Sequence, residues 1–297
     1  MPNPTATLPD SPQRGTVVIT GASSGIGEAC ALHLDGAGFS VFAGVRREED
    51  ASALRAKASS RLRTVLLDVT DLASIERAAD SVSEAAGDGG LAGLVNNAGI
   101  VVPGALEFID IGELRRQLEV NVIGQIAVTQ AFLGALRTAR GRVVNIGSIG
   151  GRVALPFVGP YNASKFAMEA LTDTLRMELY PWGIEVSIIE PGSVATEVWT
   201  KTEASADAVV GSLPTRGWAL YGEAIKAMRA TTLKFAARAI PTSHVARAVE
   251  HALTAKRPKT RYVVGLDARL QALARRLASD RILDGLIRRQ AGLPGRH

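Results

Sequence analysis

The residues best suited to chemistry are a tyrosine and a lysine four positions apart, Tyr161 and Lys165. Apolar residues recur around them at helical spacing, which predicts an amphipathic helix over 159–181. Residues i and i+4 share one helix face, so the ammonium should lie beside the phenol and lower its pKa from about 10. The pair is therefore a candidate proton donor and acceptor for a substrate oxygen. Taken alone, such a pair is more often a core tyrosine with a snorkelling lysine.

A glycine-rich turn is the second candidate site. Gly21, Gly25 and Gly27 follow an apolar, β-branched run at 15–20 and precede a helix predicted over 28–35. Glycines allow a tight turn and a close backbone approach, and the positive end of a helix attracts a pyrophosphate. A glycine motif alone is weak evidence, but between a strand and a helix it predicts a dinucleotide site.

The end of the next strand favours one cofactor over another. Folds that bind NAD usually place an acid there for the ribose hydroxyls, whereas an arginine accommodates the 2′-phosphate of NADP. Here Val45 occupies the position expected for the acid, and Arg46 and Arg47 follow it. We therefore expect NADP(H). NAD(H) is the alternative, because one of the acids at 48–50 could reach the ribose instead of beginning the next helix.

Strands and helices alternate along the chain, which is the pattern that would position these residues. This alternation is typical of a parallel sheet covered on both faces. The predicted fold class is therefore α/β, a single doubly wound Rossmann fold with a seven-stranded parallel sheet. Strands are predicted at 15–20, 40–45, 63–68, 91–96, 141–146, 183–189 and 261–264, and helices at 28–35, 71–86, 110–138, 159–181 and 242–256.

Three segments lie outside the regular alternation. Residues 1–14 contain four prolines and no apolar run, so we expect a disordered leader rather than a signal peptide. Residues 197–240, inside the catalytic domain at 15–265, follow the sixth strand and are expected to form a substrate lid. Residues 266–297 form a basic amphipathic extension. Its arginines predict a solvated helix face, with a membrane-surface or subunit contact as the alternatives.

Composition narrows the class of protein. Hydrophobic residues make up 46% and charged residues 21% of the 297 positions, as in a soluble globular protein. We predict no membrane span, because no stretch reaches about 18 uninterrupted apolar residues. The single cysteine, Cys30, excludes an internal disulfide and fits a reducing cytoplasm. Four scattered histidines give no metal-ligand spacing, and the net charge of +5 alone does not indicate a nucleic acid partner.

Six motifs stand in a fixed order along the chain: Thr20–Gly27 (TGASSGIG), Asn96–Gly99 (NNAG), Asn121 within EVNVIG, Ser148 within NIGSIGG, Tyr161–Lys165 (YNASK) and Pro191–Gly192. Together they resemble the short-chain dehydrogenase/reductase family over about residues 15 to 265. Near Ser148 and Tyr161 the chain is most similar to the branch that acts on steroids, retinoids and other lipophilic alcohols.

The resemblance implies four catalytic roles. Tyr161 would be the general acid or base, and Lys165 would lower its pKa and hold the nicotinamide ribose. Ser148 would hydrogen-bond the substrate oxygen, although a serine at such a place often only caps the next element. Asn121 would hold, through its backbone carbonyl, a water that continues the proton relay.

The resemblance also implies a set of cofactor contacts. Two parts of this set also have a purely structural explanation: Asp68 could cap a helix that begins near Asp71, and the stretch 97–99 could be a plain turn. The implied contacts are Gly21, Ser23, Ser24, Gly25, Ile26, Gly27, Arg46, Arg47, Asp68, Val69, Asn97, Ala98, Gly99, Tyr161, Lys165, Pro191, Gly192, Val194 and Thr196.

We therefore expect an oxidoreductase that transfers a hydride between NADP(H) and a lipophilic secondary alcohol or ketone. A non-catalytic sensor that binds a dinucleotide is the alternative. The apolar pocket wall that favours a lipophilic small molecule is expected to comprise Val101, Val102, Leu155, Phe157, Val158 and Trp199. The resemblance implies a homodimer or homotetramer, with subunit contacts through the helices at 110–138 and 159–181.

Overall fold

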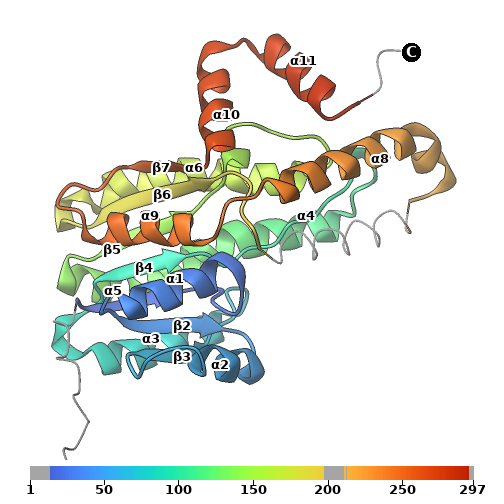
Figure 1. The fold of residues 1–297 in the computed structure, drawn as a ribbon. Coiled ribbons are helices and arrows are strands. Elements are labelled where there is room, and N and C mark those ends of the chain that lie inside the picture. Colours follow the sequence, from blue (N-terminus) through green and yellow to red (C-terminus); the bar gives the residue numbers. More distant parts are fainter. Residues whose placement is uncertain (1–13, 197–210, 212, 294–297) are drawn as a thin grey trace, which may run out of the picture.

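A seven-stranded, wholly parallel sheet organises the chain in the order β3-β2-β1-β4-β5-β6-β7 (Figure 1). The computed structural model describes residues 14–196, 211 and 213–293. The direction of winding reverses between β1 and β4, and ligands of such sheets bind outside the carboxyl ends of the strands at this switch point. The strands are β1 (Thr16–Ile19), β2 (Ser40–Val45), β3 (Leu62–Leu66), β4 (Gly93–Asn96), β5 (Arg142–Ile146), β6 (Glu185–Pro191) and β7 (Arg261–Val264).

Helices cover both faces of this sheet, which confirms the predicted doubly wound α/β fold. They are α1 (Gly25–Gly36), α2 (Glu48–Arg55), α3 (Leu72–Ala86), α4 (Ile111–Leu118), α5 (Gly124–Ala139), α6 (Gly159–Leu179), α8 (Thr215–Ala237), α9 (Ser243–Thr254), α10 (Leu266–Leu277) and α11 (Asp280–Gln290).

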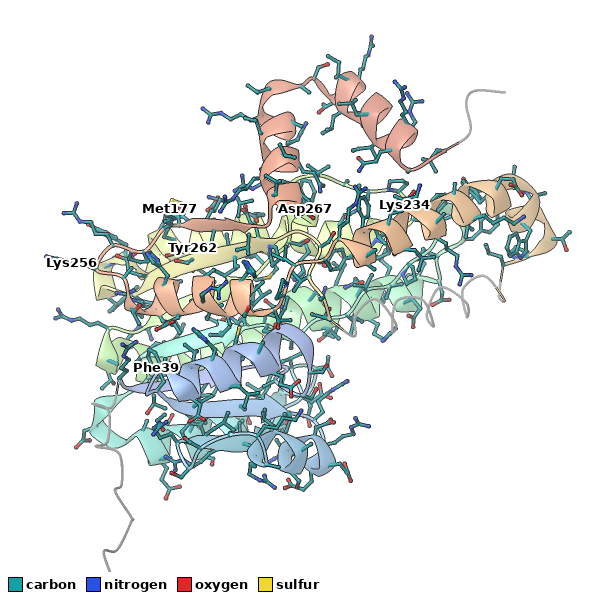
Figure 2. The ribbon with its side chains drawn as sticks, in the orientation of Figure 1. Phe39, Met177, Lys234, Lys256, Tyr262 and Asp267 are labelled. Carbon is teal, nitrogen blue, oxygen red and sulfur yellow. The ribbon has the colours of Figure 1, made fainter. Side chains whose placement is uncertain are left out.

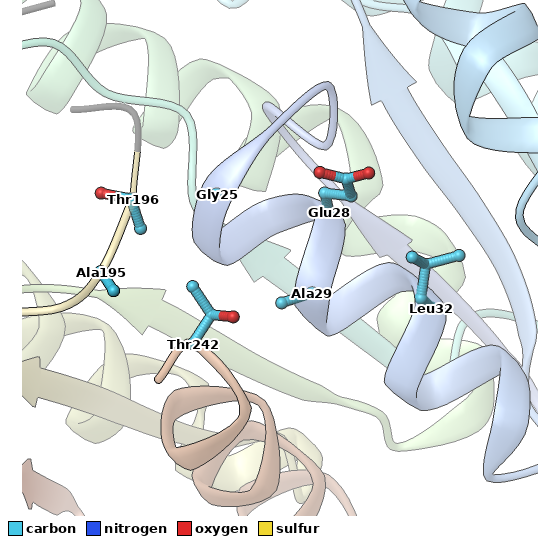
Figure 3. Close-up of a pocket in the computed structure, with 7 residues that line it drawn as sticks. All are labelled: Gly25, Glu28, Ala29, Leu32, Ala195, Thr196 and Thr242. Carbon is cyan, nitrogen blue, oxygen red and sulfur yellow. The ribbon is translucent and has the colours of Figure 1, made fainter. Parts of the chain in front are cut away.

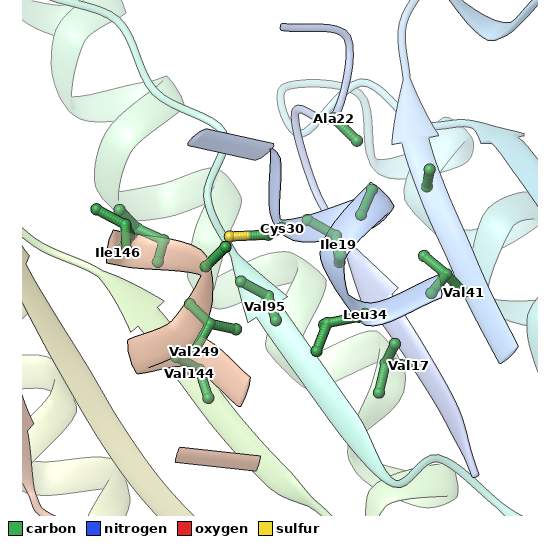
Figure 4. Packing of buried hydrophobic residues seen from close by; sticks show 14 of the residues in the cluster. Val17, Ile19, Ala22, Cys30, Leu34, Val41, Val95, Val144, Ile146 and Val249 are labelled. Atoms are coloured by element: carbon green, nitrogen blue, oxygen red, sulfur yellow. The ribbon is translucent and has the colours of Figure 1, made fainter. Parts of the chain in front are cut away.

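Alternation along the buried strands creates two hydrophobic cores. Val17 and Ile19 of β1 point into the core beneath α1 and α9, whereas Val18 between them points into the core beneath α3 and α5. Cys30 of α1 lies fully buried in the first core (Figure 4). Burial raises the pKa of its thiol to about 12. Successive side chains along each strand point to opposite faces of the sheet. The helix layers on both faces therefore pack against the same strands and fix the position of their carboxyl ends.

The helix predicted over 110–138 is interrupted in the structure. A π-helical turn, Glu119–Ile123, joins α4 to α5. Gly124 follows it and packs so tightly that an added Cβ would lie 2.3 Å from the carbonyl oxygen of Val69. The irregular turn thus lies where the helix passes the loop after β3. Such turns often occur at functional sites.

The same helical stretch bears on the predicted lack of a membrane span. Among the described residues, Ile111–Ala139 is the one helix long and apolar enough, by length and composition, to cross a bilayer. Val128, Phe132 and Leu136 on its inner face are fully buried against the sheet. A core helix of a soluble fold passes the same test, so this stretch is weak evidence for a span.

The three segments outside the regular alternation are described in part by the structure. Arg14 belongs to the folded domain, because its N–H donates to Gly38 and its guanidinium pairs with Glu250 at 3.1 Å; residues 1–13 of the predicted leader lie outside the described residues. The predicted lid contains the 23-residue helix α8. The extension forms two helices, α10 and α11, which stand away from the sheet (Figure 2).

Candidate active site

The glycine turn forms a close-packed cradle at the N-terminus of α1. Gly21 and Gly25 adopt φ angles of 64° and 61°, which side-chain-bearing residues rarely adopt. A Cβ on Gly27 would lie 2.2 Å from the carbonyl oxygen of Gly21, so only glycine lets α1 pack against the turn. The first N–H groups of α1 have no partners inside the helix and can receive an anion. This cradle fits a dinucleotide pyrophosphate.

Hydrogen bonds from the loop directly after β4 hold the glycine turn. The amide of Asn97 donates to the carbonyls of Thr20 and Gly21 at 2.9 and 3.0 Å. In return, the Thr20 hydroxyl accepts the backbone N–H groups of Asn97 and Ala98 at 2.9 and 3.0 Å. The sequence predicted that the stretch 97–99 lies along the cofactor. The structure shows that the Asn97 side chain fixes the shape of the neighbouring turn.

The two arginines after β2 differ in their environments. Arg46 is exposed. Arg47 is the N-cap residue of α2 and binds Asp50 through Nε and Nη2 at 2.9 and 3.0 Å. This hydrogen bond and the charge of Asp50 raise the pKa of the Arg47 guanidinium. A 2′-phosphate would have to share Arg47 with this carboxylate, whereas Glu48 and Glu49 lie in the first turn of α2, as predicted.

Asp68 does not cap α3. Its Oδ1 accepts the backbone N–H and the hydroxyl of Thr70 at 2.9 and 2.7 Å, which closes a short turn after β3. The cap of α3 is Asp71, which accepts the N–H of Ala73 at 3.0 Å. Val69 is buried in the second core. The turn that carries both predicted adenine contacts is therefore fixed by its own hydrogen bonds.

The structure brings Ser148, Tyr161 and Lys165 together at the carboxyl end of β5. Ser148 caps a 3-10 turn, where its hydroxyl accepts the N–H of Gly150 at 3.0 Å, and it hydrogen-bonds the side chain of Tyr161. The Lys165 Nζ lies 5.7 Å from the centre of the Tyr161 ring and donates to the carbonyl of Ile146 at 2.7 Å. The capping role considered for Ser148 and its place beside the phenol thus coexist.

The pKa of Tyr161 differs in direction from the sequence prediction. Burial raises the pKa of the phenol, and the hydrogen bond to Ser148 acts against this rise. The neighbouring Lys165 is itself only 5% exposed, and burial lowers the pKa of its ammonium to about 8. Burial shifts both groups towards their neutral forms, so helix spacing alone was not sufficient to predict the direction of the Tyr161 pKa.

Asn121 lies in the π-helical turn, fully buried beside α6. Its side-chain amide donates to the Ile100 carbonyl at 3.0 Å and to the Ser164 hydroxyl at 3.1 Å, while its oxygen accepts the Ile100 N–H at 2.8 Å. Ser164 in turn donates to the backbone carbonyl of Tyr161 at 2.7 Å. The side chain therefore links the loop after β4 to the helix that carries Tyr161 and Lys165. Its backbone carbonyl remains the group to which the resemblance gives a role.

A cluster of carboxylates that the sequence did not predict lies one helical turn beyond Lys165. We call Glu169, Asp173 and Glu190 the carboxylate cluster. Arg261 of β7 binds Glu169 at 3.0 Å and Asp173 at 2.6 Å, and Arg152 binds the fully buried Glu190 at 2.6 Å. Burial, followed by the charge of Glu190 and a hydrogen bond to it, raises the pKa of Glu169 to about 7, and Arg261 opposes this rise. The repeat 161, 165, 169 was the available signal in the sequence.

The end of β6 is held by the first turn of α10. Asp267 accepts the N–H of Ser193 at 2.8 Å, and a Cβ on Gly192 would lie 2.3 Å from Asp267 Oδ1. Val194 points into the first core, whereas Thr196 lies against Gly25. These positions bring the loop after Pro191 to the glycine turn, although Asp267 was not predicted.

A cavity of about 490 Å³ lies between this loop and α1 (Figure 3). Its lining therefore joins the glycine turn, the loop after β6 and the start of α9. The lining residues are Gly25, Glu28, Ala29, Leu32, Ala195, Thr196 and Thr242. Among the described residues, no group of three or more His, Cys, Asp or Glu side chains could hold a metal ion.

The residues predicted for the substrate wall differ in burial. Val102 is 2% exposed and packs inward, while Val101, Leu155, Phe157 and Val158 are partly exposed; Trp199 lies outside the described residues. The N–H of Gly104 donates to the Phe157 carbonyl at 2.7 Å, which joins the loops after β4 and β5. These loops form a single surface beside the catalytic candidates.

Two aromatic residues that the predicted wall omitted extend this surface. Tyr221 of α8 makes edge-on contacts with Phe108 and Phe157, with ring centres 6.0 and 6.1 Å apart. Phe157 has a φ of 61°, a strained angle for an aromatic residue that often accompanies functional sites. The signal for Tyr221 in the sequence was the aromatic content of 197–240.

The chain is similar to known dehydrogenases and reductases over most of its length. Residues 15–207 match the short chain dehydrogenase family. Retinol dehydrogenase 5 of Mus musculus is 41% identical over 280 residues, or 91% of this chain and 87% of the relative. An NADPH-dependent 3-dehydrocapnine reductase of Ornithobacterium rhinotracheale is 37% identical over 272 residues, or 90% and 94% of the two chains. The 17-beta-hydroxysteroid dehydrogenase type 6 of Homo sapiens is 41% identical over 261 residues, or 85% and 81%.

Solved structures support the same assignment. A short-chain dehydrogenase from Streptomyces avermitilis superposes with a TM-score of 0.72 at 30% identity, covering 92% of this chain and 94% of that one. A short chain dehydrogenase from Burkholderia cenocepacia in complex with NADP gives 0.70 at 26% identity, covering 95% and 100%. This chain therefore belongs to the steroid and retinol branch of the short-chain dehydrogenase/reductase family, as an enzyme that acts on CH–OH groups with NAD(P).

Proposed function

We propose that the protein interconverts a lipophilic secondary alcohol and its ketone with NADP(H), using Tyr161 to move the proton. The observation that carries this proposal is the convergence of Ser148, Tyr161 and Lys165 at the carboxyl end of β5. A bound nicotinamide would supply or accept the hydride. The chain's own residues bind and orient the substrate oxygen and move its proton.

Each residue has a distinct task in this proposal. Ser148 donates a hydrogen bond to the substrate oxygen and holds it beside the Tyr161 hydroxyl. Tyr161 donates the proton during reduction and accepts it during oxidation. The buried Lys165, whose pKa is lowered to about 8, can exchange a proton near neutral pH. Asn121 hydrogen-bonds both the loop after β4 and α6. It thereby fixes the position of this loop relative to the helix that carries Tyr161.

The test of this assignment is Tyr161→Phe. Removing this one hydroxyl should reduce the turnover rate for a panel of steroid and retinoid alcohols at least about a hundredfold. The affinity for NADPH should stay unchanged. Loss of both activity and cofactor binding would indicate a damaged fold and would be checked by thermal unfolding. Unchanged turnover would refute the role of Tyr161. A folded wild-type protein that binds the cofactor but turns over no alcohol or ketone would favour the sensor hypothesis.

A lipophilic substrate is supported by the partly exposed apolar wall and by the relatives that are named for retinol and hydroxysteroids. The edge-on contacts of Tyr221 extend this wall from α8 to the loops after β4 and β5. Such a wall makes the binding free energy of a lipophilic substrate more favourable, because it removes apolar substrate surface from water. A kinetic preference for sugars or other polar alcohols over steroids and retinoids would contradict this substrate class.

The preference for NADP rests on Arg46 and Arg47, and the ion pair with Asp50 offers a sharp test. Asp50→Asn should release the Arg47 guanidinium and tighten NADPH binding by a few-fold, because the charge that competes with the 2′-phosphate is removed. Affinity for NADH should not change in this variant. Glu49→Gln, which also removes one negative charge from the first turn of α2, is the control. Tighter wild-type binding of NADH than NADPH would contradict the preference.

A further inference from the structure

An apolar stripe faces solvent on the C-terminal arm, which we define as residues 266–290. The arm consists of α10 and α11 and stands away from the sheet (Figures 1 and 2). The side chains of the stripe are between 53% and 75% exposed. They are Leu266, Leu270, Leu273 and Leu277 of α10, and Ile282 and Leu286 of α11.

The outward direction of the stripe follows from its spacing. Steps of four, three and four residues place the four leucines of α10 on one face of the helix. The buried Ala268 lies two positions from Leu266 and Leu270, and therefore on the opposite face. A helix of a globular protein normally packs its larger apolar side chains inward. Here α10 packs through a small side and exposes its leucines, and a contiguous apolar patch of this kind marks an interaction surface.

Arginines border the stripe. The arm contains six arginines and three aspartates, which gives it a net charge of +3. Arg269 and Arg276 each precede a leucine of the stripe, and Arg289 lies three positions after Leu286. Long basic side chains beside an apolar face can extend towards phosphate groups while the leucines enter the acyl region. One of the three aspartates, Asp267, is engaged inside the fold by the N–H of Ser193.

We propose that the C-terminal arm docks on an anionic lipid bilayer, with both helices lying in the plane of the interface. The apolar stripe matches the acyl boundary, and the bordering arginines match anionic headgroups. A second copy of the chain complements this surface poorly. Two-fold pairing through the stripe would bring the arginines of both copies together and oppose association.

The arm is connected to the loop after β6 at one end and to α8 at the other. At the base of α10, Asp267 binds the loop after β6. At the end of α11, the Gln290 carbonyl accepts the Thr231 hydroxyl of α8 at 3.4 Å. Helix α8 also carries Tyr221, which borders the apolar wall. Docking would therefore bring the substrate side of the protein close to the bilayer. The docking itself requires no particular substrate.

The test is flotation of the full-length protein with two kinds of vesicle, phosphatidylcholine alone and equal parts phosphatidylcholine and phosphatidylglycerol. Leu270→Glu with Leu277→Glu places two charges in the stripe at exposed positions and should not impair folding. Leu72→Glu with Met177→Glu is the matched control, because both residues are 67% exposed and add the same charge outside the arm. Arg269→Gln with Arg276→Gln removes two border charges and leaves the stripe intact.

We expect wild type and the matched control to bind the mixed vesicles more strongly than phosphatidylcholine alone. The stripe variant should lose about tenfold or more of this binding, and the arginine variant should lose the preference for the anionic lipid. Absence of wild-type binding to either vesicle, or equal binding by the stripe variant, would overturn the proposal. Light scattering supplies a separate check. A wild-type dimer that the stripe variant converts to monomer would make the stripe a subunit interface and would also overturn the proposal.

Discussion

The carboxylate cluster predicts an unusual dependence of stability on pH, which Glu169→Gln should remove. The pKa of Glu169 is raised from 4.5 to about 7, chiefly by burial and by Glu190. A carboxyl group with a raised pKa binds more protons in the folded than in the unfolded state. Its contribution to stability is therefore fully present below about pH 4.5 and is lost as the pH rises through about 7.

The magnitude follows from the size of the shift. A change of about 2.5 pH units corresponds to about 3 kcal/mol by linkage. Because Glu169 is partly exposed and solvent screens part of the interaction, we expect about 1–2 kcal/mol. Glutamine has nearly the same shape and no titration, so the variant should lack this loss of stability. Relative to wild type, the free energy of unfolding of Glu169→Gln should therefore rise by this amount between about pH 5 and about pH 8.

Urea unfolding of wild type and variant at these two pH values measures the difference directly, because the other ionisable groups are shared by both proteins. Glu178→Gln is the control, since Glu178 lies on the same helix and is exposed. A difference between wild type and Glu169→Gln that stays constant across the pH range would refute the reasoning. So would a stability that falls equally with pH in the Glu178→Gln and Glu169→Gln variants.

Two further outcomes are expected. Gly27→Ala should destabilise the protein by about 1–3 kcal/mol or more and abolish NADPH binding, because its Cβ would lie 2.2 Å from the Gly21 carbonyl. In Gly134→Ala on α5 the added Cβ meets nothing within 4 Å, so this substitution should stabilise the protein by about 0.5–1 kcal/mol in thermal unfolding. Equal effects of Gly27→Ala and Gly134→Ala on stability would contradict the packing argument. Cys30, whose pKa is raised to about 12, should react with a thiol reagent only as fast as the protein unfolds. Rapid labelling of the native protein would contradict the burial of this thiol.

The strand pattern was readable from the sequence because each buried parallel strand is a short apolar run. The strands 40–45 and 261–264 were predicted with the observed bounds, and the others within about three residues. The interruption of the 110–138 helix was not predictable in the same way. It lies where Gly124 passes the Val69 carbonyl, a contact between segments more than 50 positions apart in the sequence. Helical periodicity describes one element and contains no information about such a contact.

The candidate site shows the same division. Tyr161 and Lys165 were placed together correctly because helix geometry alone brings i and i+4 together. The direction of the Tyr161 pKa was wrong because it depends on how deeply the fold buries the phenol. Glu169 continues the same helical repeat, yet the largest effects on it come from burial and from Glu190 of β6. Local spacing thus predicts which groups are neighbours, and tertiary packing decides their charge.

The C-terminal arm extends this argument from charge to partner. Periodicity correctly predicted amphipathic helices after residue 266, and the basic residues suggested a solvated face. Periodicity alone does not determine whether the apolar face of a helix is covered by the protein. In the structure Ala268 is buried while Leu270 and Leu277 are exposed, so the side that packs is not the side with the larger apolar surface. The exposed apolar face between arginines complements a lipid bilayer, as we propose above. The leucines match the acyl region, and the arginines match the anionic headgroups at its surface.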